Sequence, residues 1–153
     1  METTVGQLLE KKGSAVYSIA SNASIQQCAL HLREHSVGSL LILDSDKVVG
    51  ILYERDIARY VVADSKDPAT TLVSEVMCRE FASITRSTLV SEAMQVINDM
   101  RVRHLPVIEA GKVCGMISIG DLNHCMLSAQ KDDIDHLVNY ISGTTDIVMD
   151  DNR

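Results

Sequence analysis

At 153 residues, 46% of them hydrophobic and 23% charged, the chain has the size and composition of one ordinary folded unit, which excludes a disordered tail. Its formal net charge of −7 argues against nonspecific binding to nucleic acid or to an anionic membrane, since both favour a basic surface. The sequence shows neither the roughly 18 consecutive apolar residues of a membrane span nor a basic-then-apolar leader, so a cytoplasmic protein is expected.

The first half of the chain alternates short apolar runs with helical patterns. A β-rich piece at Val16–Ile19 precedes a helix whose apolar residues recur every three or four positions. Two further apolar runs, Leu40–Leu43 and Val48–Leu52, predict strands joined by a polar turn at Asp44–Asp46. A second helix is expected to begin near Asp56. The apolar residues of the first helix are Ile25, Cys28, Ala29 and Leu32.

The second half repeats this series after a polar linker, Asp64–Leu72, whose Pro68 is typical of a surface connection. A β-rich piece at Phe81–Thr85 precedes a helix, and a second helix is expected to begin near Asp121. The apolar residues of the first of these helices are Val90, Ala93, Met94 and Ile97, and the two strands after it are Leu105–Ile108 and Val113–Ile117, joined by a turn at Ala110–Gly111.

The carboxyl end of the chain predicts one more amphipathic helix, Asp132–Ser142. Its acidic residues stand at the start, where the helix dipole favours them. The remaining residues, 143–153, are expected to be loosely held. The stripe of this helix consists of Ile134, Leu137, Val138 and Ile141.

An internal repeat explains the recurring series. A shift of 65 residues places GILYERDI (Gly50–Ile57) on GMISIGDL (Gly115–Leu122) without a gap. The chain therefore predicts an α+β fold of two β-α-β-β-α units, residues 1–66 and 67–130, followed by the helix and tail of residues 131–153. The cysteines form no C-x-x-C pair, which favours buried reduced thiols over disulfides or a zinc site at Cys28, Cys78, Cys114 and Cys125.

The two repeat cores, VGSLLILDSDKVVGILYERDI and RVRHLPVIEAGKVCGMISIGDL, resemble a tandem of cystathionine β-synthase (CBS) domains, the arrangement called a Bateman module. The resemblance covers Val5–Gln130 and implies two sheets packed face to face, with two clefts related by a pseudo-twofold axis. It implies a stand-alone regulatory module, not an enzyme, that binds an adenine nucleotide (AMP, ATP or NAD(H)) or S-adenosylmethionine. It also implies a disc-like homodimer, which the helix Asp132–Ser142 could cover or extend, and an output through an unidentified effector protein.

The resemblance assigns a primary cleft around Asp121, which would hold the ribose, and Ser118, which would lie near a phosphate. Arg103 and His104 would supply positive charge to the phosphates, and the backbone of Tyr17 and Ser18 would read the adenine edge. Three more residues, Val37, Gly38 and Ser39, would form the wall beneath the base.

Each of these assignments has a purely structural alternative. Ser118 and Asp121 are spaced as a helix-capping pair, which requires no ligand. Arg103 could be a solvated surface charge, and His104 a hydrogen-bonded core histidine. If capping is the whole explanation, the protein is an interaction module with empty clefts.

A secondary cleft around Asp56 departs from the family pattern. Tyr53 replaces the expected serine or threonine, and Cys78 follows Met77 where the family often has threonine. Both substitutions predict that this cleft is altered or empty. Its remaining residues would be Arg79, Ala82 and Ser83.

A zinc hydrolase is a remote alternative. The segment HLREH (His31–His35) fits the H-x-x-E-H pattern of inverted zinc peptidases, but its repeat partner carries Val96 and Met100, and no third ligand is evident. Binding of single-stranded nucleic acid is disfavoured by the acidity and by the scarcity of aromatic residues for stacking.

Overall fold

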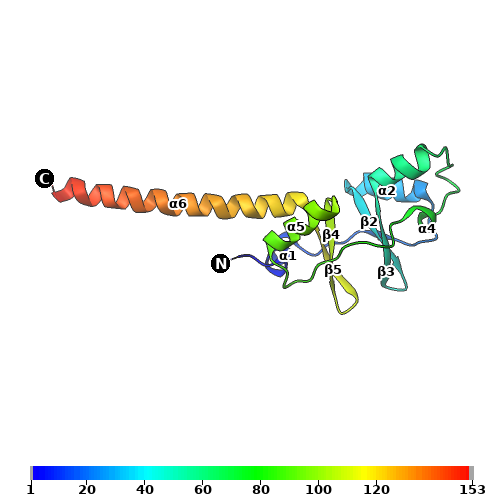
Figure 1. Ribbon diagram of the computed structural model, residues 1–153, viewed down its shortest axis with the longest axis horizontal. Helices are drawn as coiled ribbons and strands as arrows, with labels where there is room; N and C mark the ends of the chain where they lie inside the picture. The colour runs from blue at the N-terminus through cyan, green and yellow to red at the C-terminus, as the bar shows by residue number, and fades with distance from the viewer. Residues whose placement is uncertain (1, 152–153) are drawn as a thin grey trace.

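The computed structural model describes residues 2–151, and the side chains among them through Ser142. Two small sheets form the body, helices cover their outer faces, and one long helix projects away from it (Figure 1). The strands are β1 (Ser18–Ile19), β2 (Ser39–Asp44), β3 (Lys47–Tyr53), β4 (His104–Glu109) and β5 (Lys112–Ser118). The helices are α1 (Val5–Lys12), α2 (Ile25–His35), α3 (Glu54–Ile57), the π-helix η1 (Ala58–Val62), α4 (Val73–Val76), α5 (Val90–Met100) and α6 (Ile119–Asp151).

The two sheets are built around matching hairpins. Strand β2 pairs antiparallel with β3, and β4 pairs antiparallel with β5, so that Gly50 stands opposite Ile42 and Gly115 opposite Val107. Positive φ angles at Ser45 and Asp46, as at Ala110 and Gly111, form the tight turns that two-residue hairpin loops require. Strand β1 adds in parallel to β2.

The helices begin where the sequence offers caps. Ser24 accepts a hydrogen bond from the backbone N–H of Gln27 at 3.1 Å, and the Gln27 side chain accepts one from the Ser24 N–H at 2.9 Å. Thr4 and Gln7 form the same reciprocal pair at the start of α1. Each pair satisfies two backbone donors that the first turn of a helix leaves unpaired.

The amino-terminal helix of each repeat packs on the other repeat. Val5, Leu8 and Leu9 of α1 belong to the core of the second repeat. Val73 and Val76 of α4 belong to the core of the first. This exchange produces the pseudo-twofold arrangement of the two halves.

Close contact at the two motif glycines permits the exchange. A Cβ atom on Gly115 would lie 2.7 Å from Cδ2 of Leu9, and one on Gly50 would lie 2.8 Å from Sδ of Met77 and 2.9 Å from the Cys78 carbonyl oxygen. The absence of a side chain at both positions therefore lets a segment of the other repeat approach the sheet.

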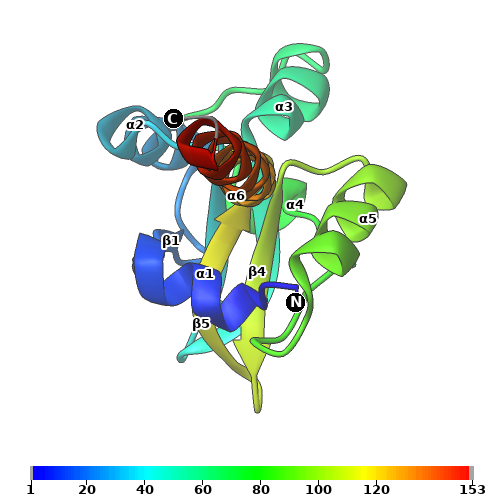
Figure 2. The ribbon, with the colours of Figure 1, turned by 90° about the vertical axis from the view of Figure 1, so that its left-hand side faces the viewer.

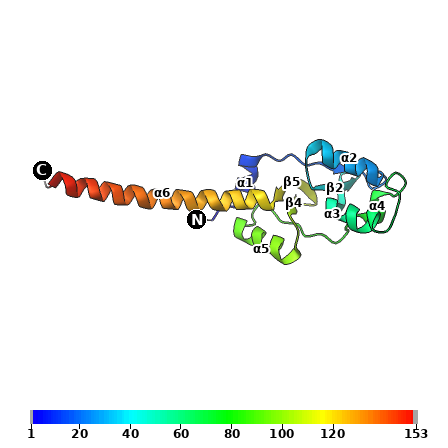
Figure 3. The ribbon, with the colours of Figure 1, turned by 90° about the horizontal axis from the view of Figure 1, so that it is seen from above.

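A third cluster of apolar residues lies between the two sheets. Leu41, Ile51 and Tyr53 of the first sheet are buried there, against Val113 and Met116 of the second. The views in Figures 2 and 3 show the strands at the centre and the helices around them. The expected α+β fold, with two repeats packed sheet to sheet, is confirmed.

Three expectations about individual elements need correction. The strand predicted at Phe81–Thr85 is reduced to a single parallel bridge between Ile84 and Val107. The helices predicted near Asp121 and at Asp132–Ser142 are one continuous helix, α6, because neither glycine nor proline interrupts residues 121–142. This helix extends through Asp151, across most of the tail expected to be loosely held, whereas Asn152 and Arg153 lie outside the described residues.

The prediction that all four cysteines are buried, reduced thiols holds in full only for Cys28. Cys28 is buried, and burial raises the pKa of its thiol to about 12. Cys78, Cys114 and Cys125 are half-buried, and all four are free thiols. Among residues 2–151, no helix has both the length and the apolarity that crossing a bilayer would require.

Candidate functional site

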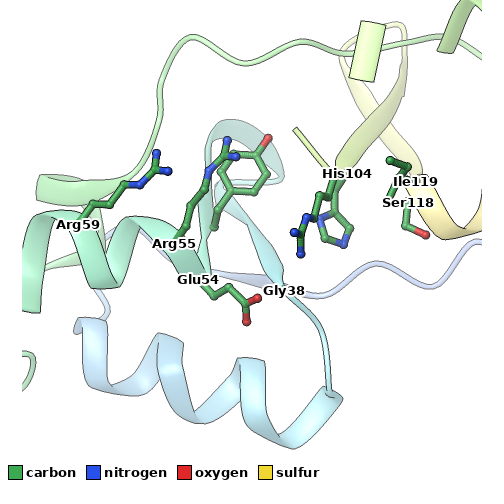
Figure 4. A pocket seen from close by; sticks show the side chains of 9 residues that line it. Gly38, Glu54, Arg55, Arg59, His104, Ser118 and Ile119 are labelled. Carbon is green, nitrogen blue, oxygen red and sulfur yellow. The ribbon is translucent and has the colours of Figure 1, made fainter. Parts of the chain in front are cut away.

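A cavity of about 550 Å³ lies between the repeats, where strand ends of both sheets meet. Figure 4 shows Glu54 and His104 on facing walls, with Ser118 beside His104. The lining from the first repeat is Gly38, Tyr53, Glu54, Arg55 and Arg59, and the lining from the second is Arg103, His104, Ser118 and Ile119. Three arginines and one glutamate make this lining net positive within a chain of net charge −7.

The arginines differ in how strongly they are held. Arg55 donates from Nη1 to the Arg101 carbonyl oxygen at 2.8 Å, and its guanidinium lies 4.8 Å from the centre of the Tyr53 ring. Within the described part of the chain, neither Arg59 nor Arg103 has a carboxylate within salt-bridge distance. These two guanidinium groups are thus available to an anion in the cavity.

His104 is the one lining residue with an unsatisfied buried atom. Its Nδ1 is buried and has no hydrogen-bond partner among the described residues, so it is not the hydrogen-bonded core histidine that the sequence left open. Burial and the nearby Lys12 lower its pKa, with a smaller contribution from Arg103, whereas Asp121 and Glu54 act in the opposite direction. His104 therefore remains neutral at pH 7 and presents an imidazole capable of a new hydrogen bond.

Asp121 is held by a capping pair and by a lysine from α1. Its Oδ2 accepts from the Ser118 N–H at 2.8 Å, and the Ser118 hydroxyl accepts from the Asp121 N–H at 3.1 Å. Lys12 Nζ lies 2.5 Å from the same carboxylate and also donates to the Met116 carbonyl oxygen at 2.6 Å. Burial alone would raise the Asp121 pKa, but the hydrogen bonds from Lys12 and Ser118 together lower it.

The structure divides the predicted primary cleft. Gly38, Arg103, His104 and Ser118 line the cavity together, whereas Asp121 lines a separate hollow of about 510 Å³ between α1 and α6. The two hollows are neighbours, because Ser118, which lines the first, is hydrogen-bonded to Asp121, which lines the second.

The other residues assigned to the primary cleft lie outside the cavity lining. The Tyr17 ring stacks on His35 with centroids 4.0 Å apart, and its carbonyl oxygen accepts from the Leu41 N–H. Val37 packs against the core of the first repeat and lines a different, more open hollow beside α2. Ser18 lies in β1, and Ser39 is buried at the start of β2.

The residues assigned to the secondary cleft are dispersed. Asp56 is buried, and its carboxylate accepts from the Tyr53 N–H at 3.0 Å. Tyr53 itself lines the cavity described above, and burial raises its pKa to about 12, with Arg55 opposing this effect. Cys78 forms a backbone bridge with Ile51. Arg79 donates to the Ser74 carbonyl, Ala82 packs against the core of the second repeat, and Ser83 is exposed.

The HLREH segment does not assemble a metal site in the residues that can be placed. The His31 and His35 rings lie on one side of α2 with centroids 6.0 Å apart, and Tyr17 stacks on the second of them. No three histidine, cysteine or acidic side chains converge on a point within the described residues.

Sequence reasoning missed five residues of this region: Glu54, Arg55, Arg59 and Ile119 in the cavity lining, and Lys12 on Asp121. Arg55 and Arg59 could have been found, because they stand four residues apart after the strand end YERDIARY and therefore share one helical face. Lys12 could not, because it is 109 residues from Asp121 and no local pattern links them.

Known proteins that resemble this chain in sequence belong to one family. The CBS domain family matches residues 12–63 and again residues 73–128. An uncharacterized 17.7 kDa protein of Acidianus ambivalens is 33% identical over 94% of this chain and 85% of its own length. The CBS domain-containing protein YhcV of Bacillus subtilis is 31% identical over 70% of this chain and 76% of its own length.

Solved structures lead to the same family. A putative signal-transduction protein with CBS domains from Burkholderia ambifaria superposes with a TM-score of 0.80 and 35% identity, covering 84% of this chain and 96% of that one. The matching regions include both hairpins and both motif segments, GILYERDI and GMISIGDL. The chain therefore belongs to the CBS domain family and carries two copies of that domain.

Proposed function

We propose that the protein is a regulatory module that binds an adenine nucleotide or another adenosyl compound between its two repeats. The observation that supports the proposal most directly is the net positive cavity that both repeats line. Its volume, about 550 Å³, lies in the range of small-molecule sites. AMP, ATP and NAD(H) carry phosphate groups that this positive lining could bind, whereas S-adenosylmethionine carries no phosphate.

The arginines favour the phosphate-bearing compounds. A guanidinium presents a planar set of donors that matches two phosphate oxygens, and Arg59 and Arg103 approach the cavity from different repeats. A ligand that bridges them stabilises one relative position of the repeats over others. Ligand binding would then change the affinity for an effector protein through that difference in packing.

In this proposal Asp121 binds the ribose, but in the structure its carboxylate forms an ion pair with Lys12. A ribose hydroxyl and the Lys12 ammonium would both donate to the same oxygen atoms, so Lys12 must rotate away or share Asp121 when the ligand binds. His104 also lines the cavity, and its unpaired Nδ1 would offer the ligand a further hydrogen bond.

The test is a thermal shift of the purified protein with AMP, ADP, ATP, NAD, NADH and S-adenosylmethionine in turn. A ligand at 100 times its Kd adds about 2.7 kcal/mol, which for this chain length raises Tm by roughly 5–11 °C. Arg103→Met and Arg59→Met should each weaken binding by about tenfold or more, as expected for the loss of a charge-assisted hydrogen bond. Arg33→Met on α2, outside the cavity lining, is the matched control.

A second candidate, an interaction module with empty clefts, is supported by the capping pair between Ser118 and Asp121. It requires that none of the six compounds changes Tm and that the arginine variants behave like the control. That result would contradict the ligand-sensing proposal.

A further inference from the structure

The outer part of α6 has no covering layer in the described structure. Every residue from Met126 to Ser142 is exposed, whereas Leu122 is fully buried and Cys125 half-buried in the core of the second repeat. Figures 1 and 3 show the helix leaving the body and continuing away from it. Residues 126–142 alone span about 25 Å of helix, at a rise of 1.5 Å per residue.

This exposed helix carries a regular apolar stripe. Leu127, Ile134 and Ile141 recur every seven residues, and Leu137 stands between the last two. Leu127 is 64% exposed, Ile134 59% and Leu137 62%. A seven-residue apolar spacing favours pairing along a seam with another helix, because it corresponds to the period of 3.5 residues in a coiled coil.

The stripe lies on the part of α6 that extends beyond the body of its own chain (Figures 1 and 3). In the view along the helix, elements of the body lie on several sides of α6 (Figure 2), so it is the length of α6 beyond the body that leaves the stripe open. A second helix can therefore lie along the stripe without displacing any element of this chain.

The residues of the seam favour a second copy in parallel, in-register alignment. Gln130 follows Leu127 by three residues, as Leu137 follows Ile134, and therefore belongs to the same seam. Parallel pairing places each seam residue opposite the same residue of the other copy, so the two Gln130 amides can hydrogen-bond to each other. An antiparallel alignment that matches Ile134 with Leu137 would place Gln130 against Ile141 and leave the amide without a partner. In the heptad that begins at Ile134, isoleucine at the first seam position with leucine (Leu137) at the second favours two strands.

The charges agree with this pairing. Asp132, Asp135 and His136 fall on the outer side of such a seam. The positions that flank it carry Met126, Lys131, Asp133, Val138 and Tyr140, so parallel alignment sets Met126 near Lys131 and Asp133 near Val138. No like charges face one another across the two helices within residues 126–142.

We propose that α6 is an interaction surface whose partner is the α6 of a second copy, joined as a parallel two-stranded coiled coil. The inference needs no bound ligand and stands independently of the nucleotide proposal. It places the contact of the expected homodimer on α6 and both bodies at the same end of the pair.

The first experiment is sedimentation equilibrium of the full chain at micromolar concentration. The wild type should be a dimer. The double variant Ile134→Lys, Leu137→Lys should raise the dimer dissociation constant at least about 30-fold, the effect of losing central interface anchors. Asn139→Lys, on the outer side of the same helix, adds the same charge and should leave the dimer intact. A monomeric wild type, or a dimer that survives the double variant, overturns the proposal.

A second experiment tests the alignment. Gln130→Cys should give a covalent dimer on mild oxidation, because parallel pairing brings the two positions together, and the unmodified chain with its own four cysteines is the control. A dimer in solution that does not cross-link through this position overturns the parallel alignment. Every variant should still unfold in one cooperative transition, since the changed side chains are exposed, and only the variant that loses the dimer should show a lower midpoint.

Discussion

The ion pair between Lys12 and Asp121 joins the first helix of the chain to the last, and its contribution can be tested directly. The substitution Lys12→Met removes the ammonium but keeps an apolar side chain of similar length. The Lys12 side chain is 34% exposed and that of Asp121 24%, so the pair is partly screened by water. Its loss should cost about 1 kcal/mol, at the upper end for surface pairs, and lower Tm by about 2–4 °C at pH 7.

The pH dependence distinguishes the ion pair from a packing effect. The folded-state pKa of Asp121 is lowered, so the carboxylate contributes stability that is fully present above its unfolded value, about 3.9, and is lost as pH falls through the folded value. The difference between wild type and Lys12→Met should therefore stay constant from pH 7 to about pH 5 and shrink below about pH 4.

The assay is thermal unfolding followed by circular dichroism across this pH range. Lys11→Met is the matched control, because Lys11 is exposed on the same helix and has no ion pair with a described carboxylate. Equal midpoints for wild type and Lys12→Met at pH 7, or a difference that persists unchanged below pH 4, would refute the assigned role of the pair.

Two further predictions concern the sheet and the cavity. In urea unfolding, Gly50→Ala should cost about 2 kcal/mol or more and Gly115→Ala about 1 kcal/mol. The new Cβ at position 50 meets the Cys78 carbonyl oxygen as well as a side chain, whereas the nearest atoms to a Cβ at position 115 belong to the flexible side chain of Leu9. Equal costs for the two substitutions would contradict this explanation. His104→Leu should not lower stability at pH 7, since it removes an unpaired buried nitrogen. Because the folded pKa of His104 is lowered, wild-type stability should fall as pH drops below about 6.5, and the variant should lose less between pH 7 and pH 5; parallel pH profiles would count against it.

Periodicity and turn chemistry were sufficient to predict the elements whose partners are close in sequence. The apolar spacing of Ile25, Cys28 and Leu32 predicted α2, and the turns at Ser45 and Gly111 correctly marked both hairpins. The repeated motifs then predicted the family, because two copies in the right order constrain the fold far more than one.

The elements that the sequence did not reveal depend on distant contacts. Helix α1 has eight residues and α4 has four, and each is stabilised by packing on the repeat to which it does not belong in sequence. The Lys12 contact to Asp121 arises from the same exchange. The division of the predicted cleft into two hollows could not be foreseen, because it depends on where α1 lies relative to the start of α6.

The exchange of α1 and α4 also sets the order in which the chain can fold during synthesis. Leu9 emerges from the ribosome early, but the strand that it covers, around Gly115, is made more than a hundred residues later. The first repeat likewise lacks Val73 and Val76 until the linker has been made. Neither half completes its core from its own residues, so the nascent chain must keep apolar surface exposed until most of the second repeat has emerged. The two domains that the family matches separately are therefore expected to unfold in one cooperative transition.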